Sequence, residues 1–131
     1  MTIADQTIQG FGNIGRNNAN FINQTEGLID ANVDDETLVL DASGSFINSG
    51  TLRASDGGTL ELRDAGTIDF ANAGGTIEAL NDSEVLLTTN ARIVGGVLET
   101  TGSGQFRVAA DQFAFLEDLT LNGPPSGRRW Q

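Results

Sequence analysis

Residues 46–62 read FINSGTLRASDGGTLEL, and the three short segments in this stretch recur in the same order along the chain. Segment A is 46–48, segment B is the Gly-led 50–54, and segment C is 60–62. Counterparts of A are 21–23, 70–72 and 93–95, of B 27–31, 75–79 and 96–100, and of C 38–40, 85–87 and 106–108. Successive A segments start 25, 24 and 23 residues apart. A repeat of this length predicts a solenoid.

Each segment is typical of a short β-strand, because apolar residues alternate with polar ones and Thr, Val, Ile, Leu and Phe predominate. Strands stacked on their counterparts in the next coil predict an all-β fold, a three-faced parallel β-helix (β-solenoid) of about five coils of 21–25 residues. Residues 7–9 and 13–14 supply B and C of an earlier coil, and 113–115 and 119–121 supply A and B of a later one.

The alignment also assigns inward and outward positions. The inward columns are Phe21, Phe46, Phe70 and Ile93 in A; Ile29, Leu52, Ile77 and Leu98, then Ala31, Ala54, Ala79 and Thr100, in B; and Leu38, Leu60, Val85 and Phe106, then Leu40, Leu62, Leu87 and Val108, in C. Like residues then stack on like, as in cross-β structures. We expect Asp30, Arg53, Glu61, Glu78 and Glu99 to point outward.

A column of asparagines follows the A segments, at Asn23, Asn48 and Asn72. Its position before a Gly-led strand resembles the asparagine ladder of right-handed parallel β-helices such as pectate lyases. The resemblance implies a right-handed coil, amides that hydrogen-bond along the axis, and a left-handed backbone at these residues and at Gly95. Phrases such as 46–54 and 56–62 also resemble repeats of bacterial surface adhesins, namely autotransporters and filamentous-haemagglutinin-like proteins.

Charge and composition exclude several classes of function. The chain has 131 residues, 18 acids against 7 basic residues, all Arg, and a net charge of -11, so it lacks the basic surface that binds nucleic acid. Without Cys and His it has no disulfide, no zinc site of the usual kind and no His general base. No apolar run approaches the length of a membrane span, and residues 1–5 lack the features of a signal peptide.

The turns between B and C are acidic and raise calcium as the one candidate cofactor. Stacked along one edge, they would bring together Asp34, Asp35, Glu36, Asp56, Asp82 and Glu84. Carboxylate oxygens suit Ca²⁺. The alternative is that Asp, Asn and Gly here only form turns and keep the protein soluble.

Two further outward columns have residue types that occur in functional sites. Glu78 and Glu99 lie one coil apart, a separation compatible with the carboxylate pair of retaining glycoside hydrolases. However, the short turns leave no walls for a substrate cleft, and the calcium-binding and basic residues of a pectate lyase cleft have no match here. The outward threonines Thr37, Thr51, Thr59 and Thr76 suggest the array of an ice-binding face, but high β propensity explains them as well.

We expect one β-helix domain, residues 1–123, and a separate tail, residues 124–131, because Pro124-Pro125 cannot continue a strand ladder. The tail holds two Arg and the only Trp of an otherwise acidic chain. Stacking of the last coil on the first coil of the next copy would cover both apolar ends. The candidate self-association residues are Leu119, Leu121, Arg128, Arg129 and Trp130.

The sequence therefore favours a non-enzymatic structural module of an extracellular or cell-surface stalk, fibre, surface layer or adhesin. Its partners would be further copies stacked end to end, or neighbouring repeats of a longer chain, and neither nucleic acid nor a membrane interior. The alternative is a carbohydrate-binding or carbohydrate-active β-helix domain, which the same scaffold can support.

Overall fold

The computed structural model describes residues 2–14, 20–42, 45–64, 70–88, 91–110 and 114–122. In these ranges every helix or strand assigned is a β-strand, so they include no helix that could cross a membrane. The strands form three parallel sheets, which we call sheets A, B and C after the segments that build them.

The three sheets take their strands in strict rotation along the chain. Sheet A consists of β1 (Thr2–Ile3), β4 (Phe21–Asn23), β7 (Phe46–Asn48), β10 (Phe70–Ala71), β13 (Arg92–Val94) and β16 (Phe115–Glu117). Sheet B consists of β2 (Thr7–Gln9), β5 (Leu28–Ala31), β8 (Thr51–Ala54), β11 (Thr76–Ala79), β14 (Val97–Thr100) and β17 (Thr120–Asn122). Sheet C consists of β3 (Gly12–Ile14), β6 (Thr37–Ala42), β9 (Thr59–Asp64), β12 (Glu84–Thr88) and β15 (Gln105–Val108).

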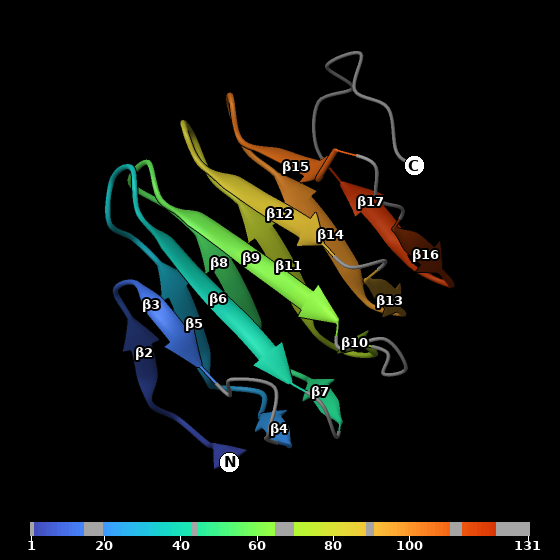
Figure 1. Ribbon diagram of the computed structural model, residues 1–131. Coiled ribbons are helices and arrows are strands. Elements are labelled where there is room, and N and C mark those ends of the chain that lie inside the picture. The colour runs from blue at the N-terminus through green and yellow to red at the C-terminus, as the bar shows by residue number, and fades with distance from the viewer. Residues whose placement is uncertain are drawn as a thin grey trace.

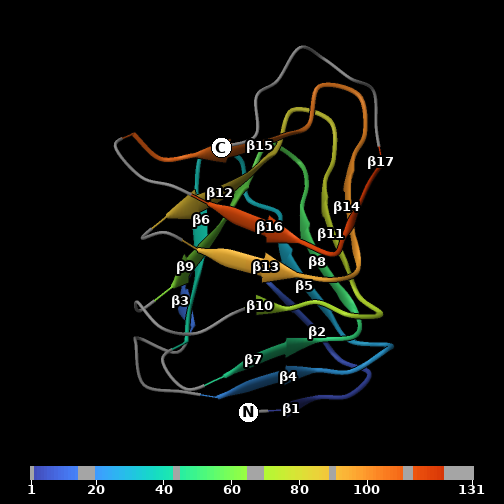
Figure 2. The same ribbon diagram turned by 90° about the vertical axis from the view of Figure 1, so that its right-hand side faces the viewer.

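Every strand inside a sheet pairs in parallel with its counterparts in the coils before and after it, and each end strand pairs with one counterpart, so the fold is the predicted β-solenoid. Figure 2 shows sheet A facing the viewer, with β1 at one end of the stack and β16 towards the other. Figure 1 shows the chain colours passing in order along the same axis. The hand of the coil and the number of coils stay predictions.

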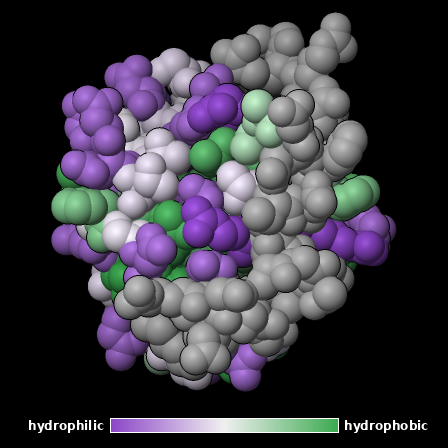
Figure 3. All heavy atoms as spheres, in the orientation of Figure 1, coloured by the Kyte–Doolittle hydropathy of each residue, from purple (hydrophilic) through white to green (hydrophobic). Residues whose placement is uncertain are grey.

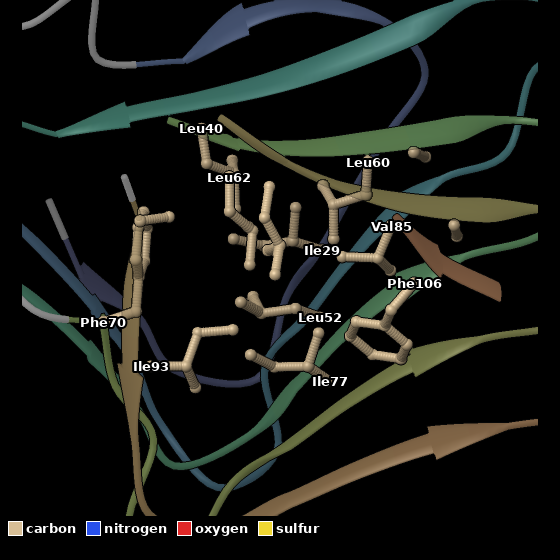
Figure 4. Packing of buried hydrophobic residues seen from close by; sticks show 14 of the residues in the cluster. Ile29, Leu40, Leu52, Leu60, Leu62, Phe70, Ile77, Val85, Ile93 and Phe106 are labelled. Carbon is tan, nitrogen blue, oxygen red and sulfur yellow. The ribbon is translucent and has the colours of Figure 1, made fainter. Parts of the chain in front are cut away.

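The core lies between the three sheets and consists mainly of the predicted inward columns, together with Ile3, Ala91 and Ala114. Of the predicted inward residues, Val108 is only partly buried and Thr100 is not part of the core cluster. Leu52 and Ile77 of sheet B, Leu60 of sheet C and Ile93 of sheet A are among the side chains that point toward one another in Figure 4. They are fully buried. Burial of each such side chain contributes about 1.5–3 kcal/mol, which makes these columns the main source of stability.

Sheet A contributes an aromatic column. Phe21, Phe46 and Phe70 are each 1% exposed and stand in register. Ring centroids are 5.4 Å apart for Phe21 and Phe46 and 5.0 Å apart for Phe46 and Phe70, within the range of favourable aromatic pairs. Ile93 continues the column with the same burial.

Two strands differ from the sequence prediction. Strand β1, which completes the first coil, is not predicted, because two residues are too few to show alternation. The last strand of sheet A is β16 (Phe115–Glu117), two residues later than the predicted 113–115, and Phe113 lies outside the described residues. The register places Leu116 opposite Ile93, which continues the core column and leaves Phe115 49% exposed.

Candidate functional site

The asparagine column forms a buried ladder of hydrogen bonds along the axis. Asn23 Nδ2 donates to Asn48 Oδ1 at 2.8 Å, and Asn48 Nδ2 donates to Asn72 Oδ1 at 2.7 Å. Asn72 Nδ2 donates to the carbonyl oxygen of Gly95 at 3.1 Å, which ends the ladder. All three side chains are no more than 1% exposed. The predicted ladder is therefore present in the described residues, and it joins successive coils.

The other end of the ladder is open. Asn23 Oδ1 is buried and has no hydrogen-bond partner among the described residues, because the coil before it presents Ile3 at the position opposite Asn23. The isoleucine side chain has no hydrogen-bond donor, so the ladder begins with an unsatisfied acceptor. The ladder thus has a direction: each amide donates toward the next coil.

The expectation that the ladder asparagines have a left-handed backbone is wrong. Within the described residues, the non-Gly residues with positive φ are Asp35, Asp56, Asp82 and Asp118, so the ladder asparagines are not left-handed. Gly95, with φ of 84°, does meet the expectation. Asparagine is needed here for its amide rather than for its backbone preference.

The Gly that opens each B segment makes room for the ladder. A Cβ at Gly75 would collide with the carbonyl oxygen and side-chain nitrogen of Asn48, and a Cβ at Gly50 would collide with the amide nitrogen of Asn23. Neither Gly75 nor Gly50 has positive φ. Close approach, not conformational freedom, therefore requires glycine at these two positions.

The acidic B-to-C turns lie between β5 and β6, β8 and β9, and β11 and β12. Asp34, Asp35, Glu36, Asp56 and Asp82 are exposed there, and Glu84 is half-buried at the start of β12. Three of these residues, Asp35, Asp56 and Asp82, have φ of 62°, 54° and 64°. Asp is one of the few non-Gly residues that accept this conformation, so these three have a role in turn formation. In the part of the chain that the structure describes, no group of three or more acids is arranged to hold a metal ion.

Neighbouring B-to-C turns are tied by side-chain hydrogen bonds. The Gly57 N–H donates to Ser83 Oγ at 3.0 Å, and the Asp82 N–H donates to Ser103 Oγ at 2.9 Å. Ser103 Oγ in turn donates to Asn81 Oδ1 at 2.9 Å. An open polar hollow of about 380 Å³ lies beside these turns. Its lining is Gly57, Gly58, Thr59, Asp82, Ser83, Glu84, Ser103 and Gln105.

On the outer face of sheet B, one arginine links three coils. Arg53 Nη2 lies 3.2 Å from Asp30 Oδ2, and Arg53 Nη1 lies 3.5 Å from Glu78 Oε2. Ser55 Oγ also donates to Asp30 Oδ1 at 2.7 Å. Asp30 points outward as expected, but these neighbours leave it only 5% exposed.

Glu99 continues this face and has a carboxylate neighbour. Its register partner is Glu78, whose pKa is raised above the usual value of 4.5. Burial is the main cause and the charge of Glu99 adds to it, while Arg53 acts in the opposite direction. The pair belongs to the outer face of sheet B, and neither residue lines the polar hollow described above.

The outer face of sheet C carries two ion-pair networks. Arg63 Nη2 lies 2.8 Å from Glu61 Oε2 and Arg63 Nη1 lies 3.8 Å from Asp41 Oδ2, while Thr88 Oγ1 donates to Glu61 Oε2 at 3.0 Å. These contacts bury Glu61 to 9% exposed, although the alternation correctly places it outside the core. Figure 3 shows one face of the molecule, where hydrophilic residues surround smaller hydrophobic areas.

The second ion-pair network on sheet C is a bidentate pair between Arg107 and Glu84. Arg107 Nε and Nη2 donate to the two carboxylate oxygens of Glu84 at 2.8 and 2.9 Å. These hydrogen bonds lower the pKa of Glu84, against the opposing effect of burial, and they raise the pKa of Arg107.

The outer face of sheet A and the threonine columns are less charged. Ile22 and Ile47 stand in register and are 38% and 43% exposed.

On sheet B, Thr51 and Thr76 are in register and half-buried, with Leu28 before them and Val97 after them. These two apolar residues interrupt the array that an ice-binding face would need.

The ends of the stack expose large apolar side chains. Phe11, between β2 and β3, is 60% exposed, and Phe115 and Leu121 in the last two strands are each 49% exposed. Leu119 packs partly against the core. The other candidate self-association residues, Arg128, Arg129 and Trp130, lie outside the described residues, as does the rest of the predicted tail.

No family model, curated protein or solved structure matches this chain. The resemblance to adhesin repeats and to pectate lyases therefore has no support from a relative, and the structure establishes the parallel β-solenoid architecture itself.

Proposed function

We propose that the protein is a non-enzymatic structural module of an extracellular stalk, fibre, surface layer or adhesin, and that its copies stack end to end. The observation that carries this proposal is the position of the exposed apolar residues. Of the five most exposed large hydrophobics in the described residues, Phe11 belongs to the first coil, and Phe115 and Leu121 belong to the last strands. Large exposed apolar groups at both ends favour contacts made there.

Electrostatics favours the same contact. The first coil, residues 2–14, contains a single charged residue, Asp5, in a chain of net charge -11. Two copies that approach side by side would bring acidic turns and faces together, and like charges oppose such contacts. An approach along the axis avoids most of this repulsion.

The core and the outer faces suit a mechanical role. The ladder of Asn23, Asn48 and Asn72 and the ion pairs of Arg53 connect consecutive coils, so that load along the axis is shared by backbone and side-chain bonds. The carboxylates that catalysis would need, Glu78 and Glu99, lie on the outer face of sheet B, where Arg53 contacts Glu78, and neither lines the polar hollow. This arrangement supports a structural rather than a catalytic role.

Light scattering across a range of protein concentrations tests the proposal. We expect the mass of the parent chain to rise with concentration. Leu121→Glu places a charge at the end of the stack and should keep the protein monomeric. The matched control is Ile47→Glu, because Ile47 is similarly exposed at 43% but lies on the side of sheet A.

Two outcomes would contradict stacking, and a third concerns only residues 124–131. A monomer at every concentration contradicts stacking, and so does equal assembly of the two variants. A chain that ends at Gly123 and assembles like the parent shows that residues 124–131 are not required. Antibody labelling of intact cells of the source organism tests the extracellular location.

The polar hollow beside the B-to-C turns favours carbohydrate binding as a second candidate function. Its hydroxyl, amide and carboxylate groups, contributed by Thr59, Gln105 and Asp82 among others, are of the kinds that bind sugar hydroxyls. A glycan array tests this candidate: binding that Gln105→Ala abolishes would support it, and the absence of any binding would remove it.

A further inference from the structure

The two ends of sheet B present the same inward column. The column runs from Ile8 in β2 through the buried Ile29, Leu52, Ile77 and Leu98 to Leu121 in β17. Ile8 is half-buried and Leu121 is 49% exposed, whereas the four residues between them are at most 1% exposed. Within the described ranges, the column is therefore incomplete at both ends, and each end lacks one apolar neighbour of the kind that the other supplies.

The end strands also have unpaired backbone edges within the described sheet. Among the strands that the structure describes, β17 pairs only with β14, and β2 pairs only with β5. Such an edge is a template for a further strand. Because all strands of the sheet run in the same direction, a second copy that is shifted along the axis presents its β2 parallel to β17. The contact joins two different surfaces and repeats without closing, so it generates a filament.

We propose, on the basis of the end-to-end stacking above, that β17 of one copy pairs in parallel with β2 of the next and continues sheet B across the joint. The register is Thr120 opposite Thr7, Leu121 opposite Ile8, and Asn122 opposite Gln9.

Side-chain chemistry selects this register. A shift by one residue would turn Leu121 away from the inward column, because side chains alternate along a strand. A shift by two residues would place Leu121 opposite Gln6 or Gly10, neither of which has an apolar side chain. Only the proposed register pairs an apolar residue with an apolar one inside the joint. On the outside it pairs threonine with threonine and one amide with another, with no like charges opposed.

Cysteine cross-linking tests the register, and no native cysteine can form competing disulfides, because the chain has none. Thr7 and Thr120 are both exposed and face outward, so their replacement leaves the core unchanged. Opposed residues of neighbouring strands lie about 4.8 Å apart. This separation is inside the Cα distance range of a disulfide, about 4.4–6.8 Å. In the variant Thr7→Cys with Thr120→Cys, mild oxidation should produce a ladder of covalent dimers, trimers and longer species.

The matched control is Gln9→Cys with Thr120→Cys. Gln9 lies on the same outer side as Thr7 but two residues further along β2, which in the proposed register sets its Cα about 8 Å from that of Thr120. This exceeds the disulfide range, so the control should cross-link at least tenfold less. Each single-cysteine variant should give dimers at most. Circular dichroism and melting curves confirm that the variants keep the parent fold.

The possible failures are distinguishable. If light scattering shows assembly but the Thr7 and Thr120 variant does not cross-link, or the control cross-links equally, the proposed register is wrong and end-to-end stacking stands. If neither the variants nor the parent assemble, the register and the proposed function both fail.

Discussion

At the scale of single residues, Asn48 shows how one amide holds three coils together. Its Oδ1 accepts a hydrogen bond from Asn23, and its Nδ2 donates to Asn72 and to the carbonyl oxygens of Gly50 and Thr76. The side chain is 1% exposed, so water cannot replace a lost partner.

Asn48→Ala should lower the free energy of unfolding by about 1–3 kcal/mol, because Asn72 Oδ1 loses the ladder donor that Asn48 supplies. Asn48→Gly should not recover this loss, since Asn48 has no left-handed backbone for glycine to relieve. Urea denaturation measures both, with Ser49→Ala in the adjacent turn as the control. Ala and Gly variants that melt with the parent would contradict a structural role for the ladder.

Phe46 and Ile47 are neighbours in β7 that face opposite sides of sheet A. Phe46→Ala should cost about 3–5 kcal/mol, because Phe21 and Phe70 keep a cavity open between them. Ile47→Ala should cost less than about 1 kcal/mol, since the side chain is 43% exposed. Equal losses in urea denaturation would contradict the observed register. Glu61, although outward, is unsuitable as a neutral control because its ion pair and hydrogen bonds bury it.

At the scale of elements, the outer faces of sheets B and C place carboxylates in opposite electrostatic environments. Glu78 of β11 is half-buried beside Glu99 of β14, while Glu84 of β12 is held by Arg107 of β15. The pKa of Glu78 is therefore raised and that of Glu84 is lowered, although both lie on outward positions of neighbouring sheets.

The two glutamates should give opposite pH dependence of stability. Because the pKa of Glu78 is higher in the folded state than the usual 4.5, its ionised form opposes folding, and its contribution improves as the pH falls through the raised pKa toward 4.5. Glu78→Gln should thus stabilise at pH 7, and the gain should vanish below about pH 4.5. Melting curves at pH 4 to 7 measure the change.

For Glu84 the sign is reversed. Its pKa is lowered in the folded state, so its contribution to stability is complete above the unfolded value of 4.5 and is lost as the pH falls through the lowered pKa. Glu84→Gln should therefore destabilise at pH 7, with a cost that shrinks in acid. A gain at pH 7 from Glu84→Gln, or a loss from Glu78→Gln, would show that local electrostatics differs from the structure.

At the scale of the whole molecule, net charge and core arrangement act in opposite directions. The chain carries a net charge of -11, and its core consists of four inward columns of sheet B and C residues and one largely aromatic column of sheet A. Repulsion among the exposed turns opposes folding, and burial of the stacked core contributes more free energy than this repulsion costs.

Salt should raise the melting temperature through screening of this repulsion. We expect NaCl and CaCl₂ at matched ionic strength to give equal shifts, because the described residues offer no group of three acids that could hold a metal ion. A larger shift with Ca²⁺, reduced by Asp82→Asn, would instead show specific calcium binding to the native state. Thermal melts monitored by circular dichroism provide the measurement.

The sequence by itself determined the solenoid, because a solenoid repeats one packing problem in every coil. The spacing of Phe21, Phe46 and Phe70 and the alternation in segments B and C predict the sheets, the register and the inward columns, all of which depend on residues close in sequence or one repeat apart. The asparagine column could be predicted from the sequence for the same reason.

The tertiary structure determined the features that depend on contacts between neighbouring coils, namely burial, close packing and hydrogen bonding. Only the stacked coils show that Arg53 and Ser55 bury Asp30, that Gly75 is needed to admit the amide of Asn48, and that Asn23 begins the ladder with an unpaired oxygen. Strand β1 and the position of β16 were likewise outside the reach of the sequence pattern. Alternation shows which way a side chain points, whereas its burial and its pKa depend on the lengths and charges of the side chains one coil away, which the period alone does not specify.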